Sequence, residues 1–284
     1  RADLLNAVAP PVLPVLQESE NVQVRSEEGL GFAYLLPNVR SGPLSDVRVR
    51  QAICHGIDTK IVVDAKFHGL ATPATGFLPS SHWAYLPTEG CSFDPARAMK
   101  LLDEAGYPDP DGPGGPLPRL TISYKTSTDR FRKSIALVFR EQLKAIGIDV
   151  DVRSLEFGTL FSDIKKGNFE LTSLKWSTVF EPDLMRQVFA VSAIPTAANN
   201  WNGFNRGGFQ NPALDETLDR AMKANPEDRA ALYGTAQQVI SKELPYISLW
   251  HEKSLAVTST RLQGFVPDPN GDLRPLEDCT EVVR

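Results

Sequence analysis

Glu181 and Asp183 are the carboxylate pair that most invites a catalytic interpretation, because they lie together in one short stretch, residues 171–183. A glycosidase-like hydrolase would use such a pair as acid and base, but solvated loop acids give the same pattern. Other reaction motifs are missing: the sequence has no G-x-S-x-G elbow, H-E-x-x-H helix, P-loop or G-x-G-x-x-G turn. We therefore predict no catalytic residue and no cofactor, and keep hydrolysis by this pair as an alternative.

Aromatic and hydroxyl side chains accompany the two carboxylates. Trp176 ends a run of strand-forming residues, and Pro182 prevents a regular element from continuing through the loop that follows. Loops at strand ends of α/β sheets are common ligand positions, because rigid strands hold them beside a crevice. Trp176, Ser177, Phe180 and Glu181 are therefore candidate ligand contacts. A core location for the two aromatic rings remains an open alternative.

A second polar and aromatic cluster contains Asn199, Asn200 and Trp201. Asn and Gly residues of this kind also serve turns, and Asn211 further on is placed to cap a helix. A Trp beside two amides suits a wet pocket, since it offers a stacking face together with donors and acceptors. We therefore include all three residues among the candidate contacts for a neutral or zwitterionic solute.

The histidines and cysteines give no support for a metal site. The four histidines lie in different predicted elements without ligand spacing, and the three cysteines include no C-x-x-C pair. Cys91 and Cys279 lie in loop-like surroundings and could pair in an oxidising compartment. Cys54 falls in an amphipathic helix, where we expect it to be a small buried side chain.

The totals restrict the class of protein. With 284 residues and 42% hydrophobic residues, the chain is long enough for a large core in one domain or two. Its formal charge is −5, and its acidic and basic residues are interspersed without a basic stripe. This pattern argues against nucleic-acid binding. The sequence has no long apolar run, so we predict no membrane insertion. It starts at Arg1 without a signal-peptide pattern, which suggests a processed or truncated sequence.

Periodicity and capping residues predict alternating strands and helices. The predicted helices cover residues 45–56, 58–67, 94–105, 129–146 and 159–166, with two more around 214–222 and 232–244. The predicted strands cover residues 22–24, 32–36, 119–125, 148–155, 169–176, 245–260 and 280–283. The strand–helix–strand order in the middle is a βαβ unit, which favours parallel neighbours in an α/β fold.

Several ordered motifs resemble a known family over nearly the whole chain. They are Tyr34–Asn38, Val47–Asp58, Gly69–Ala74, Asp94–Tyr107, Trp176–Pro182, Asn211–Asp215 and Leu244–Ile247. This order resembles the extracytoplasmic solute-binding proteins of peptide, nickel and opine importers (family 5). The resemblance implies a type II periplasmic-binding-protein clamshell, a monomer that captures a small solute or peptide between two lobes. It also implies a periplasmic or extracytoplasmic location and, as a partner, the membrane permease of an ABC importer.

The resemblance further implies a division of the chain. Residues 1–36 would belong to the first lobe, residues 37–257 to the second lobe, and residues 258–284 would return to the first. Members of the family are roughly twice as long, so an N-terminal half is expected to be missing. Because closure needs both lobes, residues 1–284 alone are expected to bind ligand weakly.

The same resemblance selects site residues on the crossing strands. Trp176 matches the strand-end Trp of the family, and the crossing strands would bring Tyr34, Trp250 and His251 near the cleft, facing the Asn-rich loop. Peptide binders of the family place an aspartate just after that Trp, where this sequence has residues 177–179, Ser-Thr-Val.

This departure leaves the ammonium contact of a peptide in doubt, although Glu181 or Asp183 could replace the missing aspartate. Nickel binders of the family use a histidine downstream, where this sequence has Ile194 and its neighbours, so nickel is disfavoured. The ligand-sensing half of a transcription regulator with the same fold is the remaining alternative to transport.

Overall fold

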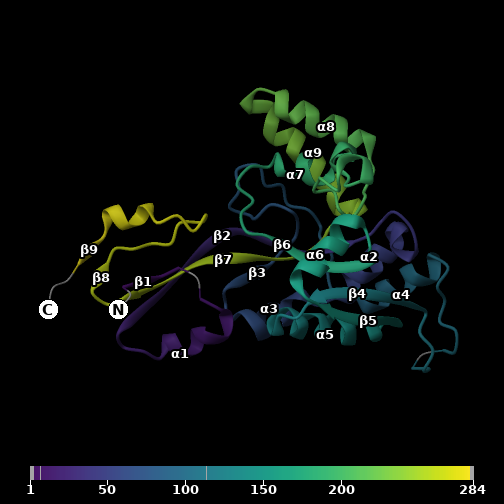
Figure 1. Ribbon diagram of the computed structural model, residues 1–284, viewed down its shortest axis with the longest axis horizontal. Coiled ribbons are helices and arrows are strands. Elements are labelled where there is room, and N and C mark those ends of the chain that lie inside the picture. Colours follow the sequence, from purple (N-terminus) through teal and green to yellow (C-terminus); the bar gives the residue numbers. More distant parts are fainter. Residues whose placement is uncertain (1–2, 7, 113, 282–284) are drawn as a thin grey trace.

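The computed structural model describes residues 3–6, 8–112 and 114–281. Figure 1 shows how its elements are arranged. The helices are α1 (Leu13–Gln17), α2 (Val47–Gly56), α3 (Thr59–Phe67), α4 (Pro95–Glu104), α5 (Arg130–Lys144), α6 (Phe157–Lys166), α7 (Leu184–Phe189), α8 (Pro212–Lys223) and α9 (Pro226–Glu243). The strands are β1 (Leu4–Leu5), β2 (Val22–Pro37), β3 (Ala71–Pro73), β4 (Leu120–Ser127), β5 (Ile148–Leu155), β6 (Leu171–Trp176), β7 (Ile247–Ser259), β8 (Leu262–Gln263) and β9 (Thr280–Glu281).

A mixed sheet of seven strands organises the chain. Its order is β1-β7-β2-β6-β4-β5, with β3 added on β7, while β8 and β9 form a separate pair. β4 is parallel to both β5 and β6, which confirms the βαβ unit expected from the sequence. β2 is antiparallel to β6 and to β7, so the parallel and antiparallel parts of the sheet meet at β6, which has β4 as a parallel neighbour and β2 as an antiparallel one.

β2 and β7 are long strands that leave the helix-covered part of the sheet together. Figure 1 shows them running as a twisted ribbon toward β1, β8 and α1. The sequence predicts two separate strands interrupted at Gly29 and Gly31, but the structure joins them into one strand of 16 residues. The glycines permit close approach: a Cβ atom on Gly29 would lie 2.3 Å from the backbone oxygen of Glu252. They mark an irregular register in one strand and do not end it.

The helices begin where the sequence provides capping side chains. Asp46, Asp58 and Asp94 accept hydrogen bonds from backbone N–H groups in the first turns of α2, α3 and α4. Asp129 and Asn211 do the same for α5 and α8. All five starts agree with the sequence prediction, whereas the short helix α7 was not predicted. No helix in the described ranges is long and apolar enough to cross a membrane.

Two hydrophobic clusters cover opposite faces of the sheet. Alternation along β2 separates them, because Ala33 and Leu35 belong to one cluster while Phe32, Tyr34 and Leu36 belong to the other. The first cluster includes residues of α2 to α5, and the second includes residues of α6 to α9. Figure 1 shows α7 to α9 above the sheet and α3 and α5 below it.

The structure contains one disulfide among the described residues, whose partners the sequence left undecided. Cys54 pairs with Cys91, with their Cα atoms 5.6 Å apart, and Cys279 is free. The loop before α4 folds back on the end of α2, where His55 Nδ1 lies 2.7 Å from the backbone oxygen of Ser92. This contact between segments distant in sequence brings the two cysteines together. The pairing of Cys91 with Cys279, which the sequence left open, does not form, and Cys54, expected only as a small buried side chain, is the partner of Cys91.

Candidate functional site

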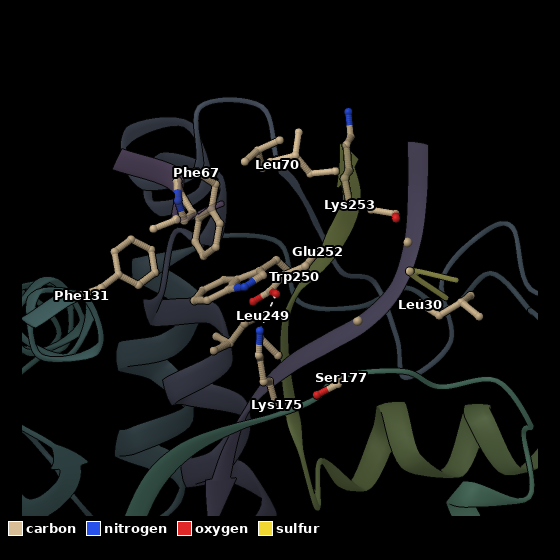
Figure 2. A pocket seen from close by; sticks show the side chains of 18 of the residues that line it. Leu30, Phe67, Leu70, Phe131, Lys175, Ser177, Leu249, Trp250, Glu252 and Lys253 are labelled. Carbon is tan, nitrogen blue, oxygen red and sulfur yellow. Dashed lines mark hydrogen bonds and ion pairs between the residues drawn. The ribbon is translucent and has the colours of Figure 1, made fainter. Parts of the chain in front are cut away.

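An open groove of about 630 Å³ lies where the β2–β7 ribbon leaves the helix-covered part of the sheet. Its walls are the end of β6, the neighbouring ends of α3 and α5, residues 6 and 8–10, and the loop at residues 269–271. Figure 2 shows side chains of β2, β7, α3, α5 and the end of β6 around the groove. A groove of this volume accommodates a small solute or a short peptide.

Aromatic rings form one side of the groove. Trp250 is only 4% exposed, and its ring centroid lies 4.9 Å from that of Phe67, the last residue of α3. Phe67 in turn meets Phe131 of α5 edge-on at 5.3 Å. The Nε1 atom of Trp250 is buried and has no hydrogen-bond partner among the described residues. An unsatisfied buried donor costs on the order of 1–3 kcal/mol, so an acceptor oxygen on a ligand would be a favourable partner.

A pair of opposite charges forms the adjoining wall. Lys175 Nζ on β6 lies 2.7 Å from Glu252 Oε2 on β7, and the side chains are 42% and 30% exposed. β2 runs between these strands, and its Gly31 is aligned with Glu252. Lys175 is aligned with Ala33, so the two long side chains meet diagonally across two small residues of β2. Figure 2 shows the pair beside the indole of Trp250.

The end of β6 also presents backbone groups to this region. β6 pairs with β2 as far as Trp176, but it pairs with β4 only at Leu171 and Thr172. Over residues 173–176, its edge on the β4 side therefore has no strand partner in the described part of the chain. Such an edge can hydrogen-bond to an extended ligand, and Ser177, just beyond it, lines the groove.

Two of the residues predicted from the sequence line the groove, Ser177 and Trp250. His251 follows Trp250 on β7 and lies on the opposite face, because successive strand residues alternate. It is 6% exposed, and its Nδ1 lies 3.3 Å from the backbone oxygen of Gly31. Burial lowers the pKa of His251 to about 4, which keeps the ring neutral at neutral pH. His251 is thus a buried residue behind the groove.

Trp176 and Tyr34 lie on the same far side. Trp176 is half-buried against the second cluster, with its ring centroid 5.7 Å from that of Phe204. Tyr34 is 1% exposed and stacks on Tyr246 at 3.8 Å. Burial raises the pKa of both phenols, that of Tyr246 to about 12. The prediction of Tyr34 as a ligand contact is corrected: alternation along β2 directs it into the core.

The loop after β6 leaves the groove. The backbone N–H of Val179 donates to Leu30 at 2.8 Å, and Phe180 is 61% exposed beyond that point. Glu181 faces Arg229 at 3.5 Å, whereas Asp183 faces Arg186 at 3.3 Å. Each carboxylate therefore has its own cation, and neither is among the groove-lining residues. The arrangement gives no support to a shared acid–base function.

The Asn-rich loop uses its amides to build a turn. The side chain of Asn199 and that of Thr196 form a reciprocal capping box, and Asn199 Nδ2 also donates to Ile194 at 2.9 Å. Asn200 and Trp201 adopt left-handed backbone conformations, with φ of 55° and 58°. These residues are outside the groove lining, so turn formation accounts for the amides that suggested a pocket.

Lys175 and Glu252 were not predicted as site residues, although their neighbours Trp176 and His251 were. The alternation of side chains along a strand could have predicted them. Residues two apart share a face, so Lys175 lies on the face of Ser177 and Glu252 on that of Trp250. Their meeting across β2 depends on strand order and register, which the sequence does not give. Within the described residues, no group of three or more His, Cys, Asp or Glu residues is placed to hold a metal ion.

Comparisons with known proteins agree on one family. Residues 1–191 match the model of bacterial extracellular solute-binding proteins, family 5. The glutathione-binding protein GsiB of Salmonella choleraesuis is 31% identical over 260 residues, which cover 89% of this chain and 49% of that protein. The chain thus spans about half the length of the curated relatives it matches.

Solved structures show the same fold. AppA of Bacillus subtilis, an oligopeptide-binding protein in complex with a nonapeptide, has a TM-score of 0.82 at 23% identity. NikA of Brucella suis in complex with Fe(III)-EDTA has a TM-score of 0.84 at 21% identity. Both matches cover 99% of this chain, but only 56% and 57% of those chains.

Proposed function

The chain belongs to the bacterial extracellular solute-binding proteins of family 5, and we propose that it forms one wall of a cleft that captures a small solute for an ABC-type importer. The groove that contains Trp250, Lys175 and Glu252 carries this proposal. It combines aromatic surface, opposite charges and an unsatisfied buried donor, which is the mixture expected for a polar organic solute. Ser177 and Trp250 are the predicted contacts that we retain.

The division into lobes is part of the proposal. We assign residues 1–36 and 258–284 to the first lobe and residues 37–257 to the second. The long β2–β7 ribbon supports this assignment, because it connects the helix-covered part of the sheet with β1, β8 and β9. The groove lies at that connection, where two lobes of a clamshell would close on a ligand.

A peptide-like solute is the class that we favour, since relatives are named as binding glutathione and a nonapeptide. We further propose a monomer that works outside the cytoplasm and delivers its solute to a membrane permease. The Cys54–Cys91 disulfide supports such a location, because disulfides persist in oxidising compartments.

Calorimetric titration tests the proposal. The sample is the full-length gene product, meaning the protein encoded by the complete reading frame that contains these residues. The ligands are panels of peptides, opines and sugars. We expect micromolar or tighter binding of at least one small solute, without turnover. If no compound of any panel binds, that result counts against solute capture. Hydrolysis of a bound solute would favour an enzyme.

A further inference from the structure

The Lys175–Glu252 pair places two opposite charges in contact in the wall of a groove whose other lining residues are both apolar and polar. Both side chains keep contact with solvent, at 42% and 30% exposure. An ion pair of this kind contributes little net stability, so opening it to admit a ligand costs little as well. The condition is that each charge finds a new partner in the complex.

The surrounding charges limit the ligand groups that fit. Arg132 also lines the groove, and its backbone N–H is capped by the carboxylate of Asp129 at 2.9 Å. Lys253 lines the groove too, but Figure 2 shows its ammonium directed away from the pair. Asp129 and Glu252 are the carboxylates among the described lining residues. The carboxylate of Asp129 caps α5, which leaves Glu252, beside Trp250, as the carboxylate for a ligand ammonium. Lys175 is the adjacent cation for a ligand carboxylate.

Trp250 provides an independent indication of a ligand oxygen at this place. Its side chain is more than nine-tenths buried, and its Nε1 has no partner among the described residues. Figure 2 shows the indole beside Glu252 and Lys175. A carboxylate oxygen of a ligand bound to Lys175 would lie near this donor and satisfy it.

We propose that this subsite binds solutes whose ammonium and carboxylate are attached to one carbon atom, such as an amino acid or the γ-glutamyl end of a γ-linked peptide. The ammonium binds Glu252 and the carboxylate binds Lys175, so that four alternating charges form a closed ring. The carboxylate also accepts a hydrogen bond from Trp250 Nε1. The N-terminus of an α-linked peptide offers an ammonium without a carboxylate on the same carbon. Its binding to Glu252 breaks the ion pair and leaves Lys175 without a new partner. The inference rests on the proposed function, because it names a solute class for the same groove.

Two isomeric dipeptides test the inference. γ-Glutamylglycine and α-glutamylglycine have the same composition and net charge, but only the γ isomer carries both groups on one carbon. In calorimetric titrations of the full-length gene product, we expect the γ isomer to bind at least about tenfold more tightly. Its N-acetyl derivative, which lacks the ammonium, should bind at least about tenfold more weakly than the γ isomer itself.

Substitutions then assign the effect to the pair. Glu252→Gln and Lys175→Gln should each weaken binding of the γ isomer at least about tenfold. Asp151→Asn is the matched control, since Asp151 forms a 2.7 Å ion pair with Arg153 on β5, away from the groove. It should leave binding unchanged. Thermal unfolding of each variant shows whether it is folded, and the comparison of isomers on the unaltered protein needs no variant.

The outcomes separate this inference from the proposed function. Equal binding of both isomers, binding of other solutes but of neither isomer, or unchanged binding in folded Glu252→Gln overturns the inference and leaves solute capture standing. Failure to bind any solute from the peptide, opine and sugar panels overturns both. Preference for the γ isomer that is lost in Glu252→Gln supports the inference.

Discussion

Lys175 of β6 and Glu252 of β7 form a 2.7 Å ion pair across the intervening strand β2, above Gly31. The strands that carry them are not neighbours: Lys175 is aligned with Ala33 and Glu252 with Gly31, so the two side chains meet diagonally across β2, where the residues between them are small. A Cβ atom on Gly31 would lie 3.3 Å from the Cβ of Glu252 and 3.4 Å from the backbone oxygen of Ser177. The glycine thus shapes the groove while allowing the ribbon to continue.

The two glycines of β2 should respond differently to substitution by alanine. Gly31→Ala places its Cβ 3.3 Å from the Cβ of Glu252 and 3.4 Å from the backbone oxygen of Ser177, which requires only a small shift, so it should lower the free energy of unfolding by about 1 kcal/mol. Gly29→Ala would bring a Cβ to 2.3 Å from a backbone oxygen, so we expect a loss of about 2–3 kcal/mol. Urea unfolding of both variants measures the difference. Equal stabilities would contradict the close approach of β7 at Gly29.

Substitution of Trp250 should mainly weaken solute binding, whereas substitution of Trp176 should mainly lower stability. Trp250→Phe removes the Nε1 donor in the groove and should weaken solute binding by about 1 kcal/mol, or roughly fivefold. Trp176→Phe alters the far side of the sheet, against Phe204, and should affect mainly stability. Calorimetry together with thermal unfolding distinguishes the two. A larger loss of affinity in Trp176→Phe would place the ligand on that other face.

Reduction of the disulfide should destabilise the protein. The bond between Cys54 and Cys91 closes a loop with a sequence separation of 37 residues, for which about 2–4 kcal/mol is expected. Denaturant unfolding with and without reductant measures this loss. Cys279→Ser is the control, because Cys279 is free and should not alter the response to reductant. An unchanged midpoint under reducing conditions would be evidence against the Cys54–Cys91 bond.

His251 should make stability fall in mildly acidic solution. Burial lowers its pKa to about 4 in the folded chain, below the value of about 6.5 expected in the unfolded chain. As the pH falls from about 6.5 to about 4, the unfolded chain takes up a proton first, so up to about 3 kcal/mol of stability is lost. Unfolding free energies of His251→Gln should decline less steeply over this range. Parallel declines would show that His251 does not titrate in this way.

Local signals account for the parts of the fold that the sequence predicted well. Asp46, Asp94 and Asp129 cap their own helices, so each helix start is encoded within a few residues. The predicted strand end at Gly29 is wrong. Glycine commonly ends a strand, whereas here it allows β7 to approach β2 closely. The residues around Gly29 do not indicate which strand packs against it.

The site was harder to predict than the fold, because it depends on contacts between distant segments. Trp250 and His251 were both predicted because the family resemblance places a crossing strand there, but only Trp250 lines the groove, whereas His251 is buried on the other face. The partner of Glu252 lies on β6, 77 residues earlier, and only the order β7-β2-β6 brings the two together. Cys54 and Cys91 illustrate the same limit, since the loop that joins them must first fold back on α2.

A crystal structure of the full-length gene product with the solute that it binds most tightly tests the central claim most directly. We predict the solute in the groove, with polar atoms within hydrogen-bond distance of Glu252 or Lys175 and of Trp250 Nε1. A solute bound on the opposite face of β6, beside Trp176 and Phe204 and without contact to that pair, would contradict the account.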